Sequence, residues 1–402
     1  MASTVIQLPY NIITYIFELA KNDEIIKLSE LIILDTIDLE LPSLYSILEI
    51  DIDIKLIINK KILNNIFFNF NKIIIKTENI NISLCKNIFS YAKNLIHLTF
   101  NSSGMIPIPL KDLLNNLPNL THLIFDVWFF NEPLEDSLFS LNKLTHLDFK
   151  GFVFNQPLEN SLDKLLNLTH LSFSGNSYCE SFNKSLGKSL NNLINLRHLT
   201  FGGDFNQPLE NSLDNLINLR HLTFSNNFNQ PLENSLDKLS NLTHLTFGNS
   251  FNVPLEKSLD NLLNLTHLTF GDKFNQSLEN SLNNLINLKH LIFRLTFNQY
   301  LENSLDNLIN LTHLTFGNYF NVPLENSLDN LINLIQLTFG YEFNVPLENS
   351  LENLINLTHL TFGYDFNVPL ENSLDNLINL THLSFDYNFN VSLENSLDKL
   401  EY

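Results

Sequence analysis

Histidine is the residue type in this sequence best suited to chemistry near neutral pH, because its ring nitrogens exchange protons there and bind metals. All twelve histidines occupy one position of a repeated Leu-x-His-Leu-x-Phe motif. They are His97, His122, His146, His170, His198, His221, His244, His267, His290, His313, His359 and His382. Gln336 takes this position in the one remaining copy of the motif.

Three roles for this histidine column were compared. A metal site needs three or four converging ligands, whereas a flat ladder of strands supplies at most two neighbours. A catalytic histidine needs a nucleophile and an orienting acid, and a residue repeated in every copy has no unique partners of that kind. We therefore expect a surface ladder about 5 Å apart from strand to strand that contacts a partner, with His221, His244, His267, His290 and His313 as binding candidates. Protonation is expected to change its binding between about pH 7 and 5.5.

Other catalytic and cofactor signatures are missing from the sequence. It contains no phosphate-binding glycine motif, no nucleophile-elbow motif and no zinc-binding His-Glu-x-x-His, and only 11 of its 402 residues are glycine. Cys85 and Cys179 are the only cysteines and lie too far apart in sequence for a metal-binding pair. We expect a protein that is not an enzyme and has no cofactor or metal.

The net charge of −20 disfavours phosphate backbones and anionic membranes as partners, so we expect neither nucleic acid nor membrane binding. The first residues show no signal-peptide pattern, and charges interrupt every apolar stretch. A cytoplasmic location is therefore expected. After residue 95 the chain carries 32 acidic and 14 basic residues, so most of the negative charge belongs to its repeated part.

A 23-residue repeat positions the histidines. The dipeptide Phe-Asn recurs at this spacing from Phe205 to Phe389, with less regular copies from Phe130 onward. A leucine-rich period of this length predicts a solenoid, because one unit cannot cover its own apolar face. In Leu219–Phe224 the alternation of apolar and polar residues predicts a short parallel strand.

The remainder of each unit predicts the back of a coil. Leu232, Leu236 and Leu239 would face inward on either a short helix or a pair of tight turns. The Asn after each corner Phe is expected to be buried, accepting from a backbone amide and donating to a carbonyl of the next coil. A column of glutamates, exemplified by Glu210, is expected near the start of the turn, where the amide dipole favours acids.

Two sequence patterns resemble known families. The Leu-x-x-Leu-x-Phe strand with its Asn corner resembles a leucine-rich repeat, and the Phe-Asn-x-Pro core, as in Phe228–Pro231 and Phe251–Pro254, resembles the FNIP repeat of social amoebae and amoeba-infecting giant viruses. The resemblance spans about residues 94–402. It implies an α/β solenoid of leucine-rich-repeat type, with a parallel sheet on one face, short helices or turns on the other, and a helical N-terminal cap.

The N-terminal pattern differs. Leu8, Pro9, Ile12, Ile13, Ile16 and Phe17 form an apolar helical pattern opened by Pro. This pattern is similar to the first helix of an F-box, which implies that these six residues dock the adaptor of a cullin-type ubiquitin ligase; a capping helix is the alternative. The resulting division is an F-box-like or capping segment at 1–50, irregular first coils at 51–94 and the solenoid at 95–402.

The three residues between each strand Phe and the following corner Phe vary from copy to copy, and we call them the loop row. Tyr319, Tyr341, Tyr364 and Tyr387 gather in its C-terminal copies. Aromatic residues are enriched at interface hot spots, so these four are partner-binding candidates, although a self-packing ladder is the alternative. Two functions stay open: a protein-interaction scaffold, as in the substrate receptor of a cullin-type ligase, and a structural or decoy repeat protein with no dedicated partner.

Overall fold

The computed structural model describes residues 25–27, 47–51, 72–77, 85–86, 89–90, 92–104, 110–151, 153–175, 181–393 and 396. The chain divides into two units, Met1–Leu196 and Arg197–Tyr402. Each is built from successive coils that contribute one strand to a parallel sheet.

The first unit contains seven described strands in chain order. They are β1 (Ile25–Lys27), β2 (Ile47–Asp51), β3 (Lys72–Thr77), β4 (His97–Ser102), β5 (His122–Val127), β6 (His146–Phe149) and β7 (His170–Phe173). The short helix α4 (Leu110–Leu114) lies between β4 and β5. Because β1 to β3 pair with one another and with β4 in parallel, the sheet begins well before residue 95.

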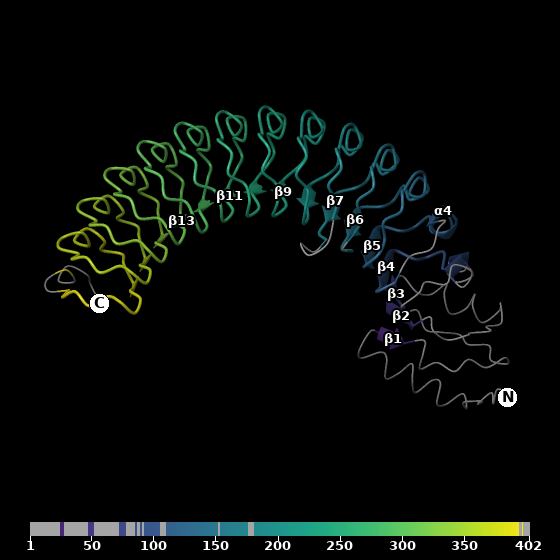
Figure 1. Ribbon diagram of the computed structural model, residues 1–402, viewed down its shortest axis with the longest axis horizontal. Helices are drawn as coiled ribbons and strands as arrows, with labels where there is room; N and C mark the ends of the chain where they lie inside the picture. The colour runs from purple at the N-terminus through teal and green to yellow at the C-terminus, as the bar shows by residue number, and fades with distance from the viewer. Residues whose placement is uncertain are drawn as a thin grey trace. The chain divides into compact units, whose positions relative to one another are not determined.

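The second unit repeats one coil with little change. Its strands are β8 (His198–Phe201), β9 (His221–Thr223), β10 (His244–Thr246), β11 (His267–Thr269), β12 (His290–Ile292), β13 (His313–Thr315), β14 (Gln336–Thr338), β15 (His359–Thr361) and β16 (His382–Ser384). Neighbouring strands pair in parallel with equivalent residues opposite each other, as His244 lies opposite His267. In Figure 1 the strands of this unit lie along its inner side and the turn segments along its outer side.

The back of each coil in the second unit is a series of tight turns. The amides of Ser235, Leu239 and Leu242 donate to carbonyls three residues earlier, at 2.9–3.0 Å. Of the two alternatives, turns rather than helices are therefore present, and the described residues of this unit contain no helix. The turns still point their leucines inward, and Leu232, Leu236, Leu239 and Leu242 are all at most 1% exposed.

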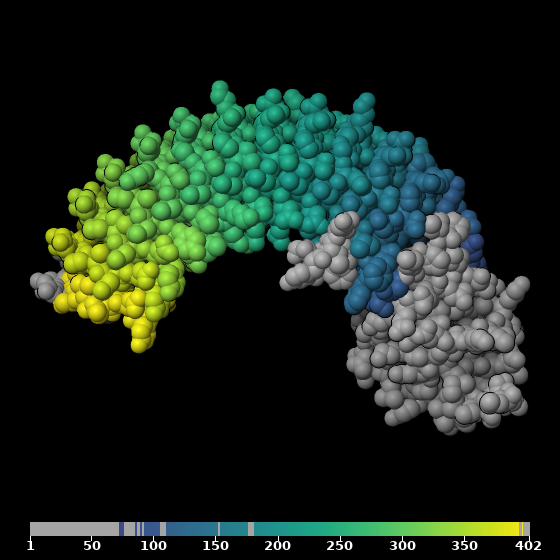
Figure 2. Space-filling view, in the orientation of Figure 1, coloured from purple at the N-terminus to yellow at the C-terminus, as the bar shows by residue number. Residues whose placement is uncertain are grey.

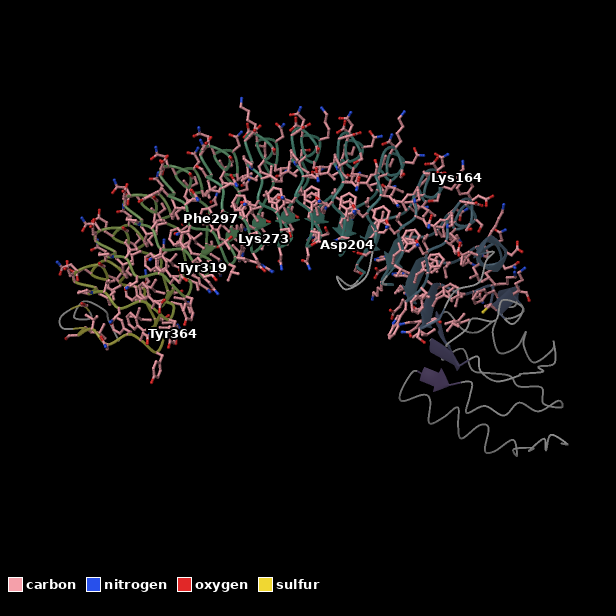
Figure 3. All side chains as sticks on the ribbon, in the orientation of Figure 1. Lys164, Asp204, Lys273, Phe297, Tyr319 and Tyr364 are labelled. Carbon is pink, nitrogen blue, oxygen red and sulfur yellow. The ribbon has the colours of Figure 1, made fainter. Side chains whose placement is uncertain are left out.

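Two columns of phenylalanine fill the space between the sheet and the corner. The strand residue Phe247 stacks on the corner residue Phe251 at 4.1 Å between ring centroids. It also stacks on Phe224 and Phe270 of the adjacent coils, at 5.5 and 5.6 Å. Figure 3 shows this row of rings inside the coils, with Phe297 labelled, and in Figure 2 the coils merge into a continuous surface.

The corner asparagines form a ladder along the second unit. The backbone amide of Asn252 donates to Oδ1 of Asn229, and that of Asn275 donates to Oδ1 of Asn252, at 2.8 and 2.9 Å. The expected acceptor role is confirmed, but the expectation of burial is wrong, since Asn229 and Asn252 are exposed. Donation to a neighbouring carbonyl comes instead from another column, in which Asn241 Nδ2 contacts the Ile217 carbonyl at 2.8 Å.

The glutamate column occupies a backbone position of positive φ. Ten glutamates from Glu135 to Glu371 have φ between 44° and 49°, and Gly187 takes the same position with φ 49°. This left-handed region costs an L-residue free energy that glycine does not pay. In the second unit the expected place near the start of the turn is confirmed, since Glu233 and Glu256 are the first turn residues of their coils, but the turn begins with a left-handed bend and is not helical.

Candidate functional site

The histidine column forms a stack on the exposed face of the sheet. In the first unit, His97, His122, His146 and His170 stack with ring centroids 3.9–4.0 Å apart. In the second unit, the spacing is 4.1–4.3 Å from His198 to His313. All five histidine candidates lie in this second run, so the structure brings them together. Register pairing holds the rings at this spacing, because equivalent Cα atoms face one another on parallel strands.

A threonine hydroxyl orients most of these rings. Thr243 Oγ1 donates to the Arg220 carbonyl at 3.0 Å and lies 2.9 Å from Nδ1 of His244. Since the hydroxyl has one hydrogen and the carbonyl takes it, we assign the ring hydrogen to Nδ1, which donates to Oγ1. The other ring nitrogen, Nε2, is then an acceptor. Thr266 and His267 repeat this arrangement.

The environment of the column lowers the pKa of several of its rings, chiefly by desolvation. Desolvation, followed by repulsion from His244 and His290, lowers the pKa of His267 to about 4. Desolvation and the neighbours His97 and His146 likewise lower the pKa of His122 to about 4. These rings therefore protonate below the expected interval of pH 7 to 5.5, because each proton must enter a partly dehydrated row of like groups.

Parallel stacking also bears on metal binding. Rings inclined by only 9°, as His244 and His267 are, direct their free nitrogens along parallel lines rather than toward one point. Within the described residues, no group of three or more His, Cys, Asp or Glu side chains is arranged to hold a metal ion. The geometry suits a row of hydrogen-bond acceptors.

Gln336 interrupts the row in the second unit. It pairs in register with His313 and His359, but its side chain bonds weakly to Thr338 Oγ1 of its own strand, at 3.5 Å. Beyond it, His359 and His382 resume the stack at 4.1 Å. The backbone therefore accepts glutamine in this column.

The tyrosine candidates separate into a stack and a single residue. Tyr341 and Tyr364 stack at 4.7 Å and Tyr364 and Tyr387 at 6.4 Å, since all three hold the second position of the loop row. Tyr319 holds the third position, where its backbone amide donates to the Leu295 carbonyl. The expected cluster of four is therefore a stack of three with Tyr319 in the adjoining column.

Acidic groups surround this stack. The pKa of the Tyr341 phenol is raised by desolvation and then by Tyr364, Asp365, Asp386 and Glu342. Beside it lies a hollow of about 540 Å³. The residues lining the hollow are Asn321, Glu342, Asn344, Asp365, Asn367, Asn388 and Asn390.

The sequence analysis missed a second groove in the same unit. This groove, of about 790 Å³, runs along the residues that precede the strands. Its lining consists of Lys289, Asn310, Thr312, Asn333, Ile335, Asn356, Thr358, Asn379 and Thr381. The repeated Asn-Leu-Thr triplets could have indicated it, because they place a polar pair at one edge of many strands. Asn310 and Asn356 each donate Nδ2 to the carbonyl of an isoleucine one coil earlier, at 2.8 Å.

A column of half-exposed aliphatic side chains was also missed. In the second unit its members are 49–63% exposed: Ile217, Leu263, Ile286, Ile309, Ile332, Ile355 and Ile378. The recurrent Leu-Ile-Asn-Leu string could have indicated this column. The repeat period alone, however, does not show whether its isoleucine points inward or outward.

Several residues singled out from the sequence lie outside the described residues, and one cysteine is buried and unreactive. The adaptor-binding candidates Leu8, Pro9, Ile12, Ile13, Ile16 and Phe17 lie outside them, as does Cys179. Cys85 is buried, and desolvation raises the pKa of its thiol to about 12, so it is unreactive at neutral pH. No described helix has the length and apolar character needed to cross a membrane.

Comparison with known proteins supports the fold. No family model matches the chain, and no curated protein matches it in sequence. Among solved structures, TLR13 in its complex with ssRNA13 is similar at 19% identity and a TM-score of 0.68, over 88% of this chain and 54% of that one. The Drosophila Toll–Spätzle complex is similar at 15% identity and a TM-score of 0.69, over 88% and 49%.

A leucine-rich-repeat protein of Leptospira interrogans is similar at 17% identity and a TM-score of 0.56, over 95% of this chain and all of that one. The chain spans about half the length of the TLR13 and Toll structures. These similarities show a leucine-rich-repeat-like parallel solenoid. FNIP membership and the F-box resemblance stay predictions.

Proposed function

We propose that this chain is a non-catalytic cytoplasmic scaffold that binds another protein through the strand face and loop row of its second unit. The proposal draws on the fold, which the Toll–Spätzle complex shares, and on the surface that the coils present. Nucleic acid is a poor partner for a chain of net charge −20, although one similar structure is a complex with RNA.

One observation carries the proposal: a repeated frame in the second unit supports a loop row whose side chains differ. The third loop residue donates its amide to the second loop residue of the preceding coil in both early and late coils, as in Ser250 to Asn226 and Glu342 to Asn318. The side chains on this common backbone range from Lys273 to Tyr364, both near the inner margin in Figure 3. Fixed backbone with varied side chains is the arrangement that selective recognition requires.

The test is co-purification with quantitative mass spectrometry. A loop-exchange variant would replace Gly340–Glu342 and Gly363–Asp365 by Gly-Asn-Ser, the native loop at Gly248–Ser250. It keeps both glycines, because a Cβ at Gly340 or Gly363 would clash with the backbone of the preceding coil. We expect this variant to lose at least one protein that the native chain retains. A matched control, Lys238→Asn, changes the outer turn to the residue found at Asn215 and should retain it.

Identical co-purifying proteins for all three chains would contradict the proposal. That outcome would favour the structural or decoy function, for which the uniform strand face is the supporting observation. Circular dichroism of each variant separates loss of binding from loss of fold.

We further propose that the scaffold is the substrate receptor of a cullin-type ubiquitin ligase. The support is the F-box-like pattern from Leu8 to Phe17. The full chain and an Ile12→Glu/Ile16→Glu variant would be titrated with a purified ligase adaptor. Binding only by the native chain would support this role, and equal or absent binding by both would contradict it while leaving the scaffold proposal intact.

A further inference from the structure

The three stacked tyrosines form a partly exposed aromatic feature of the second unit. Tyr341 is 47% exposed and Tyr387 is 86% exposed. In the coil before the stack, Asn318 holds the same loop position as Tyr341, so no aromatic ring continues the row there. The stack therefore ends at Tyr341 on one side without a further ring, and Tyr387 exposes most of its side chain at the other end.

The charge around the stack has one sign. From Leu295 to Leu393 the sequence carries eleven acidic residues and no Lys or Arg. Three of the eleven are sequence neighbours of the stacked rings: Glu342 follows Tyr341, Asp365 follows Tyr364, and Asp386 precedes Tyr387. No basic side chain in the described residues of these coils competes for them. A cation arriving here meets ring faces and carboxylates together.

The adjoining hollow supplies a place for a chain to lie. Glu342 and Asp365 line it together with Asn344 and Asn367 of the corner ladder. The ladder uses the Oδ1 atoms of Asn321, Asn344 and Asn367 to accept backbone amides, at 2.9–3.0 Å. The asparagine lining is thus held in place by hydrogen bonds, and the hollow also contains two carboxylates.

The ring spacing favours a planar cation. Tyr364 and Tyr387 are inclined by 12° with centroids 6.4 Å apart, nearly the separation that admits a flat group between two rings. A guanidinium is planar, stacks on aromatic faces and donates to carboxylates in a bidentate manner, whereas an ammonium does neither stacking nor forked donation. In an extended peptide, alternate side chains on one face repeat at about 6.8 Å. This repeat is close to the 6.4 Å step from Tyr364 to Tyr387 and longer than the 4.7 Å step from Tyr341 to Tyr364.

We propose that the Tyr341–Tyr364–Tyr387 stack, with Glu342, Asp365 and Asp386, binds an arginine-bearing extended segment of a protein partner. This inference deepens the scaffold proposal and rests on it. The arginines stack on the ring faces and donate to the carboxylates, and the peptide backbone lies along the hollow.

The probe is a fluorescent peptide that alternates arginine and serine, Ser-Arg-Ser-Arg-Ser-Arg-Ser, titrated with the full chain and followed by anisotropy. Matched peptides carry lysine or glutamine in place of arginine. We expect the arginine peptide to bind at least five-fold more tightly than the lysine peptide, and the glutamine peptide to show no saturable binding. Binding should weaken with added salt, because charge pairing contributes.

The decisive variant is Tyr341→Asn/Tyr364→Asn/Tyr387→Asn. It keeps the fold, because Asn226, Asn249 and Asn318 occupy this loop position in other coils. We expect at least ten-fold weaker binding. Tyr300→Ser is the aromatic control: Tyr300 is 58% exposed outside the stack, and Ser277 is the native residue one coil earlier. It should bind as the native chain does.

A Glu342→Gln/Asp365→Asn variant isolates the charges and should reduce both the affinity and its salt dependence. Equal affinity of the arginine and lysine peptides, or unchanged affinity of the triple tyrosine variant, would overturn the proposal in favour of nonspecific attraction. If partners found by co-purification depend on the loop exchange but not on the tyrosines, the proposal fails and the scaffold function stands. If the co-purifying partners depend neither on the loop exchange nor on the tyrosines, both the arginine-site proposal and the scaffold proposal are contradicted.

Discussion

In the second unit, the buried columns of leucine and phenylalanine keep the same residue in each coil, whereas the residues of the loop row vary from coil to coil. Leucine and phenylalanine recur at each interior position, and Leu245, Phe247 and Phe251 are at most 2% exposed. The loop row changes from Gly248-Asn249-Ser250 to Gly363-Tyr364-Asp365, while its backbone hydrogen bonds stay the same. The interior must match the coils above and below, whereas side chains at the second and third loop positions, such as Asn226 and Asn227, meet solvent.

We infer that the buried columns determine the stability of the fold and that the loop row determines which partner is recognised. A change in an interior column disturbs three coils at once, because each ring touches its equivalents on both sides. A change at the second or third position of the loop row alters a surface and little else, whereas the first position packs on the backbone of the preceding coil. Mutations in the two regions should therefore differ in size by a large factor.

The largest effect is expected for Phe247→Ala. Phe247 contacts Phe224, Phe251 and Phe270, and its removal leaves a cavity that the flanking coils cannot close. We expect a loss of about 3–5 kcal/mol in the free energy of unfolding, measured by urea denaturation. The loop-row change Tyr341→Asn should cost less than about 0.5 kcal/mol. Similar losses for the two variants would refute the separation of roles.

The asparagine ladder should show an intermediate effect. Asn252→Ala removes the acceptor of the Asn275 amide and of Gln276 Nε2, at 2.9 and 3.0 Å. We expect a loss of about 0.5–1.5 kcal/mol, limited because water reaches this exposed corner. Asn252→Asp retains the acceptor oxygens and should stay close to the native value. If aspartate and alanine destabilise equally, the ladder bond is not the cause.

Replacing a residue of the glutamate column by glycine is expected to increase stability. Glu256 has φ 48°, and Gly187 occupies the equivalent position in another coil. Glu256→Gly removes a strain of roughly 1–2 kcal/mol and adds an entropic cost of about 0.5–1 kcal/mol, so a net gain of up to about 1 kcal/mol is expected. Glu256→Val should be destabilising, because a branched side chain tolerates this region poorly. Thermal unfolding of the two variants would decide.

The smallest single-site effect concerns pH. The pKa of His267 is lowered to about 4 in the folded chain, so the unfolded chain binds protons first as the pH falls through 6.5. The stability of the native chain should therefore decline from about pH 6.5 to 4 and stay flat above that interval. His267→Gln introduces the residue that Gln336 supplies in another strand, and it should reduce the slope of this decline slightly.

Carboxylates also titrate at the lower end of that interval, so the difference between native and variant is the informative quantity. Parallel pH profiles for the two chains would mean that His267 titrates alike in the folded and unfolded states.

Much of the solenoid follows from local pattern. The 23-residue period, the alternation in Leu219–Phe224 and the spacing of Leu232, Leu236 and Leu239 were enough to predict parallel coils with strands on one face. These features are local, because each coil contacts chiefly its neighbours and every 23-residue repeat must bury the same apolar face. The facing of the histidines was predicted for the same reason.

Other features required the packed structure. The back of the coil in the second unit is a set of turns, whereas Leu110, Leu114 and Leu117 with the same spacing carry the short helix α4 in the first unit. Leucine spacing alone therefore does not choose between helix and turns. The glutamate position is left-handed because the backbone must bend there, and the abundance of glutamate gave no sign of it. The separation of Tyr319 from the other tyrosines depends on a one-residue offset within the loop.

The same division applies to the candidate binding surface. Composition and repetition were sufficient to point to an acidic repeat protein, and they placed tyrosine and histidine at the surface. Stacking distances, the hollow beside Glu342 and Asp365, and the lowered pKa of His267 arise only when coils lie against one another. Desolvation and contact depend on neighbours in space, so these properties come from the stacking of the coils.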